Sequence, residues 1–220
     1  MIAEELVEHF PVLDATGVCR SAFVRRIPGI DVSDNKPEVL PRLDAVHREV
    51  RHSLGMGNWP LITAEQIHGD RIALVDRAQN RDQELGGYDG FITDQRELSL
   101  GIHVADCCAV YIVDPNTPAI GLVHSGKKGT ALAIVAKAVA KLGKAFGSIP
   151  ADLIVQLSPC IRPPHYEIDF ATDIVEQCRA AGVKQIHDCG VCTACDLARY
   201  YSYRAEKGKT GRMLALLGLV

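Results

Sequence analysis

The sequence predicts a protein of mixed α/β (α+β) class. Amphipathic segments with helical spacing alternate along the chain with short apolar runs that are typical of strands. The 220 residues, 47% of them hydrophobic and 23% charged, can bury one sizeable core. No repeat, low-complexity tract or Gly/Ser linker divides the chain. We therefore expect residues 1–220 to form a single domain.

Four segments are predicted to be helical. Apolar side chains fall at helical spacing over residues 36–54, and residues 131–146 have an apolar face opposite a lysine-rich face. Thr130 is the expected N-cap of this second helix. Residues 170–181 form the third helix, and a fourth is expected to follow Thr193.

The strand-like runs lie between these helices, at 72–75, 90–93, 98–104, 109–113, 119–124 and 153–157. The turn sequence D-P-N-T-P at 114–118 predicts that the strands on either side form a hairpin or lie next to each other. Cys107 precedes the first of these strands and His124 ends the second. A hairpin would bring these two side chains toward each other.

Charge and composition argue against several classes of protein. The net charge of −3 supplies no bulk positive field for nucleic acid or an anionic membrane. No apolar run approaches the roughly 18 residues of a spanning helix, and the acidic start M-I-A-E-E lacks the basic region of a signal peptide. We expect a cytoplasmic protein without a nucleic-acid or membrane partner, and its oligomeric state is left open.

The chain contains eight cysteines, which in a cytosolic protein favour metal binding or catalysis over disulfides. Cys189, Cys192 and Cys195 form a C-x-x-C-x-x-C run that is typical of structural zinc or iron–sulfur sites. His187 is the only further ligand evident there. A second metal is one interpretation of this run, and three reduced thiols around a helix start is the favoured one.

His68, Cys107 and His124 each lie in a short, unusual motif, namely Q-I-H-G at 66–69, A-D-C at 105–107 and V-H-S-G at 123–126. Two imidazoles and a thiolate suit Zn²⁺, and three protein ligands leave a fourth position for water or substrate. The separations of 39 and 17 residues are too long to identify a metal site by themselves. Without further evidence, each histidine would be an ordinary core or surface residue.

A set of motifs in fixed order adds that evidence. They are Q-I-H-G at 66–69, D-G-F-I-T at 89–93, A-D-C at 105–107, H-S-G-K-K-G at 124–129, S-P-C-I at 158–161, H-Y-E-I at 165–168, C-T at 192–193, Y-S-Y-R at 201–204 and T-G-R at 210–212. Together they resemble the multicopper polyphenol oxidase, or laccase-domain, family, also called purine nucleoside phosphorylase-like. The resemblance runs from about residue 22 to the C-terminus, and it implies a single-domain layered sandwich of mixed β-sheet flanked by helices.

The resemblance also implies a chemistry. It implies Zn²⁺ bound by His68, Cys107 and His124, with purine nucleoside phosphorolysis, adenosine deamination and methylthioadenosine phosphorolysis as activities. A nucleoside and phosphate would then be the partners. Copper is less expected, because multicopper enzymes need several His-rich sites and the eight histidines here include no H-x-H pair.

Further roles are assigned to residues near these motifs. His68, Cys107 and Asp106 are the candidate catalytic residues, although Asp106 is nearly as well interpreted as a structural carboxylate. Gln66 either contacts the substrate or merely points outward from a strand. His103 is an extra imidazole near Cys107, and alternation along its strand is expected to point it elsewhere.

Four cations are candidates to hold phosphate: Arg25, Arg26, Lys127 and Lys128. Lys127 and Lys128 replace the Trp-Arg pair of the family, so positive charge is kept without the bidentate fork of arginine. A solvated loop face is the alternative interpretation of these two lysines. Arg204 and Arg212 are expected to form structural ion pairs.

Three other functions fit the same residues. Cys107 as nucleophile and His124 as base would make a cysteine hydrolase, for example one that acts on a peptidoglycan precursor. A copper-dependent polyphenol oxidase is the second alternative. The third is a binding protein without activity, which the altered Lys127-Lys128 loop keeps open. Metal content distinguishes the hydrolase from the zinc enzyme.

Overall fold

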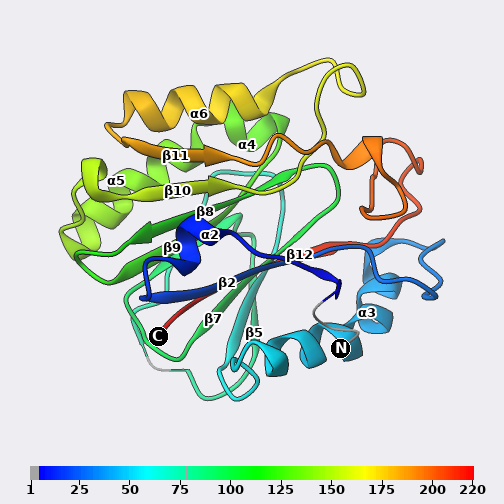
Figure 1. Ribbon diagram of the computed structural model, residues 1–220, viewed down its shortest axis with the longest axis horizontal. Coiled ribbons are helices and arrows are strands. Elements are labelled where there is room, and N and C mark those ends of the chain that lie inside the picture. The colour runs from blue at the N-terminus through cyan, green and yellow to red at the C-terminus, as the bar shows by residue number, and fades with distance from the viewer. Residues whose placement is uncertain (1–4, 78) are drawn as a thin grey trace.

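The computed structural model describes residues 5–77 and 79–220 and contains two mixed β-sheets packed face to face (Figure 1). Sheet A has the spatial order β1 (Val7–Glu8), β2 (Cys19–Val24), β12 (Met213–Leu219), β7 (Ser99–Val104), β3 (Leu61–Glu65), β5 (Gln83–Gly86). Sheet B has the order β11 (Gln185–Asp188), β10 (Ile154–Leu157), β8 (Cys108–Asp114), β9 (Ala119–Ser125), β6 (Gly90–Thr93), β4 (Ile72–Leu74). Helices flank both sheets, so the predicted layered sandwich of mixed β-sheet is confirmed.

Alternation along the central strands buries both faces of each sheet. In β8, Tyr111 enters the core between the sheets, whereas Val110 faces the helices outside sheet B. In β12, Leu217 enters the central core and Leu216 packs toward the helix outside sheet A. A strand buried on both faces is apolar at every position, which explains why β12 shows no polar–apolar alternation in the sequence.

Three helices cover the outer faces. Helix α3 (Lys36–Ser53) packs on sheet A, while α5 (Ile134–Phe146) and α6 (Phe170–Ala180) lie outside sheet B (Figure 1). Helix α3 begins after Asn35, whose side chain accepts the Glu38 N–H at 3.3 Å. The helices predicted at 36–54 and 170–181 are confirmed. None of the helices in the described ranges combines the length and the apolar character needed to span a bilayer.

The helix predicted at 131–146 is interrupted. It consists of α4 (Lys127–Ala131) and α5, because Ala133 adopts the left-handed conformation with φ 56°. Thr130 lies inside α4 and its hydroxyl is 2.8 Å from that of Ser125, so the prediction that it caps the longer helix is wrong. The helix expected after Thr193 is also wrong, since only the 3₁₀ turn η2 (Thr193–Cys195) forms there.

The six predicted strands are all present, with ends within one residue of those expected. The hairpin is confirmed as well: β8 and β9 are antiparallel, with Ala109 opposite His124. The Asp114 carboxylate accepts the N–H groups of Asn116 at 3.0 Å and Thr117 at 2.9 Å, which closes the turn. The hairpin therefore places Cys107, one residue before β8, beside the end of β9.

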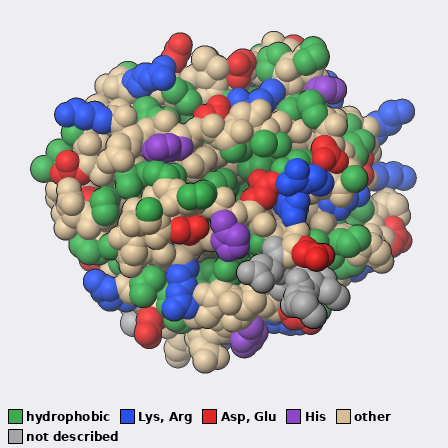
Figure 2. Space-filling model, viewed as in Figure 1, with side chains coloured by type: hydrophobic (Ala, Val, Ile, Leu, Met, Phe, Trp, Pro, Cys, Tyr) green, Lys and Arg blue, Asp and Glu red, His purple; other side chains and the backbone are tan. Residues whose placement is uncertain are grey.

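Two short elements, α2 (Pro11–Asp14) and η1 (Pro150–Asp152), complete the described fold. Figure 2 shows acidic and basic side chains interspersed over the face seen in Figure 1. This distribution agrees with the small net charge of −3.

Candidate metal centre and its cavity

His68, Cys107 and His124 form one cluster. A nitrogen from each imidazole and the Cys107 Sγ all lie within 4.8 Å of one another. The two imidazole rings meet edge to face, with centroids 4.8 Å apart and planes at 75°. His68 belongs to the loop between β3 and β4, Cys107 immediately precedes β8, and His124 lies near the end of β9. Segments from distant parts of the chain thus supply the three candidate ligands.

The carboxylate of Asp89 makes hydrogen bonds to the segments that carry both histidines of the cluster. Asp89 immediately precedes β6 and is fully buried. Its Oδ1 accepts the His68 backbone N–H at 2.9 Å and lies 2.8 Å from Nδ1 of His124. Its Oδ2 accepts the N–H groups of Gly69 at 2.7 Å and Ile67 at 3.2 Å. The carboxylate therefore orients the His124 ring through Nδ1 and fixes the backbone at His68, and Nε2 of His124 remains as the ring nitrogen that can bind a metal. Sequence reasoning assigned Asp89 no role, although its motif D-G-F-I-T was recognised.

Two residues of the site adopt strained backbone conformations. His68 has φ 59° and Asp106 has φ 83°, in the left-handed region that residues other than glycine rarely occupy.

The Asp106 carboxylate accepts hydrogen bonds from the hydroxyl of Thr193 at 2.8 Å and from the backbone N–H of Arg204 at 2.7 Å. Both of its oxygens thus tie the segment before β8 to the C-terminal segments.

Cys107 and His124 form a charged pair in the metal-free protein. Burial by itself would raise the pKa of the Cys107 thiol, but the charge and hydrogen bonds of His124, with help from His68, lower it to about 6. Burial disfavours the charged form of His124, yet the charge of Cys107 and the hydrogen bond to Asp89 raise its pKa to about 9. The lowered pKa favours the thiolate at neutral pH, which is the form that binds metals.

The backbone leaves room for this sulfur at one position. A Cβ on Gly126 would lie only 2.4 Å from Sγ of Cys107, so any side chain there would displace the thiolate. The two nitrogen donors and one sulfur, the carboxylate behind His124 and the space at Gly126 together fit a Zn²⁺ ion.

The cluster opens into a cavity of about 710 Å³, a size typical of small-molecule sites. The cavity is lined by aromatic and apolar side chains, Ile161, Tyr166, Phe170 and Tyr203, and by a set of cations, Lys36, Lys127, Lys128, Arg204, Lys207 and Arg212. Arg204 pairs with Glu167 at 2.8 Å, as expected of an ion pair. Arg212 instead donates to the carbonyls of Thr210 and Gly211. Sequence reasoning did not assign these cations other than Lys127 and Lys128 to the site.

The other predicted phosphate cations lie away from this cavity. Arg26 pairs with Glu206 at 2.6 Å and donates to the Tyr200 carbonyl at 3.1 Å. Arg25 donates to the backbone carbonyl of Glu5. Neither arginine is among the residues that line the cavity. Of the four predicted cations, Lys127 and Lys128 are therefore the two that line the cavity.

The amide of Gln66 lines the cavity but is occupied by the backbone. Its Nε2 donates to the His103 carbonyl at 2.7 Å, and its Oε1 accepts the His103 N–H at 3.1 Å. This arrangement joins the loop that carries His68 to β7. Gln66 thus serves here to position the loop.

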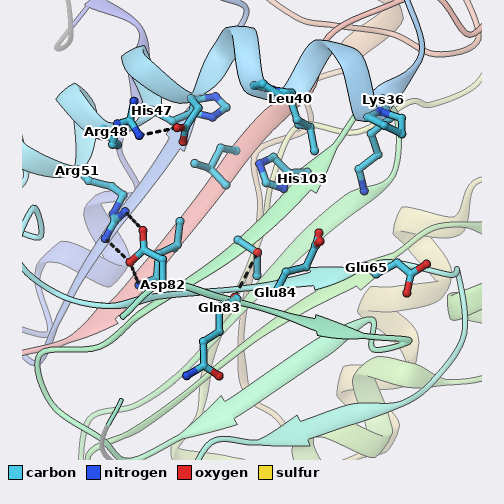
Figure 3. A pocket seen from close by; sticks show the side chains of 16 residues that line it. Lys36, Leu40, His47, Arg48, Arg51, Glu65, Asp82, Gln83, Glu84 and His103 are labelled. Carbon is cyan, nitrogen blue, oxygen red and sulfur yellow. Dashed lines mark hydrogen bonds and ion pairs between the residues drawn. The ribbon is translucent and has the colours of Figure 1, made fainter. Parts of the chain in front are cut away.

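A second cavity, also of about 710 Å³, lies between α3 and sheet A (Figure 3). It shares Lys36 and His103 with the first cavity, and Figure 3 shows Arg51 paired with Asp82 on its wall. The His103 ring is 5.9 Å from that of His47, and burial lowers the pKa values of both imidazoles, that of His47 to about 4. His103 lies outside the metal cluster, as strand alternation predicts.

The fold groups two of the three cysteines in the run near the C-terminus and leaves the third apart. Cys192 and Cys195 lie together with His165, and one ligand atom from each is within 4.8 Å of the others. Cys189 and His187, the other residues of the predicted second site, lie outside this group of described side chains. The imidazole beside these cysteines is therefore that of His165, whereas the sequence suggested His187 as the further ligand.

Comparison with known protein families identifies the family to which this chain belongs. The family model described as multi-copper polyphenol oxidoreductase laccase matches residues 13–174 and 164–220. The chain belongs to this family, as its motifs predicted.

Relatives with similar sequences carry a different name. The purine nucleoside phosphorylase YlmD of Geobacillus stearothermophilus is 28% identical over 240 residues, which cover 92% of this chain and 86% of that protein. The protein of the same name from Bacillus subtilis is 25% identical, covering 92% of this chain and 85% of that one. The crystal structure of the Bacillus licheniformis hypothetical protein YfiH superposes with a TM-score of 0.78 at 26% identity, covering 92% of this chain and 93% of that chain.

Proposed function

We propose that this protein is a zinc-dependent purine nucleoside phosphorylase that also deaminates adenosine and cleaves methylthioadenosine with phosphate. The observation that carries the proposal is the His68–Cys107–His124 cluster at a cation-lined cavity of about 710 Å³. The names of the related YlmD proteins support nucleoside and phosphate as the small-molecule substrates.

His68, Cys107 and His124 would hold the metal, with Asp89 keeping the His124 ring in place. A bound Zn²⁺ supplies a Lewis acid and lowers the pKa of water at the cluster. Two imidazoles and one thiolate are a donor set that suits Zn²⁺, and a multicopper centre would need further His-rich sites that the sequence does not offer.

Phosphorolysis requires an oriented anion and a stabilised leaving group. A phosphate oxygen forms a bond to C1′ of the ribose, while the bond from C1′ to the purine breaks and leaves its electron pair on the base. Lys127 and Lys128 would hold the phosphate by charge, and the purine would pack against the aromatic side chains that line the cavity, such as Tyr166 and Tyr203. In the second activity, the oxygen of a water molecule would form a bond to C6 of adenosine, and the bond from C6 to the amino group would break, which releases ammonia and leaves inosine.

A second function is favoured by the contact between Cys107 and His124. Their hydrogen bond and opposite charges lower the pKa of the thiol and raise that of the imidazole, which favours the thiolate–imidazolium pair that a cysteine hydrolase requires. Such an enzyme could act, for example, on a peptidoglycan precursor. The two functions differ in metal dependence, because chelation stops the zinc enzyme and spares the hydrolase.

The test of the proposed function follows the products of adenosine with and without phosphate. The zinc-loaded protein is expected to release adenine and ribose 1-phosphate only when phosphate is present, and inosine and ammonia in either case. Removal of the metal with a chelator should abolish both reactions, and added Zn²⁺ should restore them. Undiminished turnover by protein shown to be metal-free would refute the zinc mechanism.

The phosphate site gives a further prediction. Replacing Lys127 and Lys128 together by alanine should raise KM for phosphate about 30-fold, since each substitution removes a charge-assisted contact worth on the order of 1 kcal/mol, about 2 kcal/mol for the pair. Arg25→Ala is the matched control, because Arg25 lies away from the cavity. Steady-state kinetics at varied phosphate would measure both variants. Equal KM values in the wild type, the double variant and Arg25→Ala would mean that other cations of the cavity bind the phosphate.

A further inference from the structure

Cys192, Cys195 and His165 form a second cluster of metal-binding side chains, separate from the first. The Cys195 Sγ lies 3.5 Å from Nδ1 of His165, and the Cys192 Sγ lies 3.8 Å from the same atom. All three ligand atoms are within 4.8 Å of one another, and both thiols are free. Nothing in the phosphorolysis mechanism uses these residues.

The spacing of these atoms fits a tetrahedral ion. Zn–S bonds of about 2.3 Å and Zn–N bonds of about 2.0–2.1 Å place a sulfur and a nitrogen ligand about 3.6 Å apart. The two observed S···N distances, 3.5 and 3.8 Å, bracket this value. Thiolate and imidazole donors favour Zn²⁺ over Mg²⁺ or Ca²⁺, which take oxygen ligands.

The fold holds the two halves of the cluster together without a metal. Cys160 donates its N–H to the Val191 carbonyl at 3.2 Å, and Thr193 donates its N–H to the Cys160 carbonyl at 3.2 Å. This bridge fixes the segment that leads to His165 against the turn η2, which carries Cys195. A metal here would find its ligands already arranged.

We propose that Cys192, Cys195 and His165 bind a second Zn²⁺ ion, with water as the fourth ligand. Thr193 lies between the two cysteines, and its hydroxyl donates to Asp106 at 2.8 Å, next to Cys107. The second ion thus stabilises the turn that supports one wall of the catalytic cavity. His165 and Cys195 are exposed, so solvent and chelators reach this ion directly.

The experiment is a matrix of variants whose zinc content is measured after purification under reducing conditions and equilibration with Zn²⁺. The wild type is expected to hold about two zinc ions per chain, and Cys195→Ser and Cys107→Ala about one each. The variant with both substitutions should hold none. Cys189→Ser is the matched control, since this neighbouring exposed cysteine lies outside the cluster, and it should keep the wild-type content. His165→Ala checks the site without a change of cysteine and should lose about one ion.

A second readout guards against misfolding and does not depend on activity. In the Cys107→Ala background, added Zn²⁺ should raise the melting temperature, and Cys195→Ser should abolish this shift while leaving the metal-free melting temperature nearly unchanged. Wild-type zinc content in Cys195→Ser and His165→Ala would overturn the proposal. The proposal would also be overturned if Cys192 and Cys195 formed a disulfide and the reduced protein took up no second ion. The disulfide would be seen as a mass lower by two hydrogens.

Discussion

Cys107→Ala is expected to remove the catalytic zinc and to lower nucleoside turnover by about a thousandfold or more. The substitution deletes the one sulfur ligand and the thiolate that pairs with His124, so two imidazoles remain, too few to hold Zn²⁺ tightly. The measurement is zinc content together with adenosine and phosphate turnover. It is made in a Cys195→Ser background, where the expected change is from about one ion per chain to none.

Cys108→Ala is the matched control. Cys108 is the next residue, but its side chain is buried on the opposite face of β8 among the residues that pack under α5 and α6. This variant should keep its zinc and its turnover, with a loss of stability on the order of 1 kcal/mol. If Cys107→Ala loses turnover but keeps the ion, Cys107 is a nucleophile and not a ligand.

Asp89→Asn should produce the largest loss of folding stability among these variants. The two carboxylate oxygens of Asp89 accept four hydrogen bonds in the fully buried site. An amide has one acceptor oxygen, so its NH₂ group must face two of those donors, which leaves both unsatisfied. At about 1–3 kcal/mol for each of the two unsatisfied groups, the free energy of unfolding should fall by roughly 2–6 kcal/mol.

The same substitution should weaken zinc binding about 10- to 100-fold, because Nδ1 of His124 loses the carboxylate that orients the ring. Denaturant unfolding of the metal-free protein and a competition titration with a zinc indicator measure the two effects. Asp70→Asn is the control, since this half-exposed carboxylate of the same loop pairs with Lys137 at the surface, and its replacement should leave the free energy of unfolding nearly unchanged. An Asp89→Asn protein as stable as Asp70→Asn would contradict the role assigned to Asp89.

The elements that the sequence predicts correctly are those with strong local signals. The turn at 114–118 contains Asp and two prolines, and it specifies the β8–β9 hairpin that brings Cys107 beside His124. Helices α3 and α6 have clear apolar faces and bury them as predicted. Strand β12 was missed because its continuous apolar run lacks the alternation that distinguishes a strand from a buried helix.

The candidate site was predicted less completely. The motifs identify His68, Cys107 and His124 as a set, but nothing local in the sequence links His68 to residues 39 or more positions away. Asp89 was missed because a carboxylate before a strand resembles any loop residue until its four donors are seen around it. Arg25 and Arg26 were expected at the phosphate because of their charge, but their partners lie elsewhere.

The sequence by itself therefore determined the class of fold, the family and the three candidate ligands, since these follow from periodicity, turn residues and ordered motifs. The tertiary structure alone decided which groups surround those ligands. It placed Asp89 behind the imidazoles, gathered Lys36, Lys207 and Arg212 around the cavity, and joined His165 to Cys192 and Cys195. The reason is physical: such contacts depend on how two sheets pack and where their connecting loops meet, and neither is encoded in residue spacing.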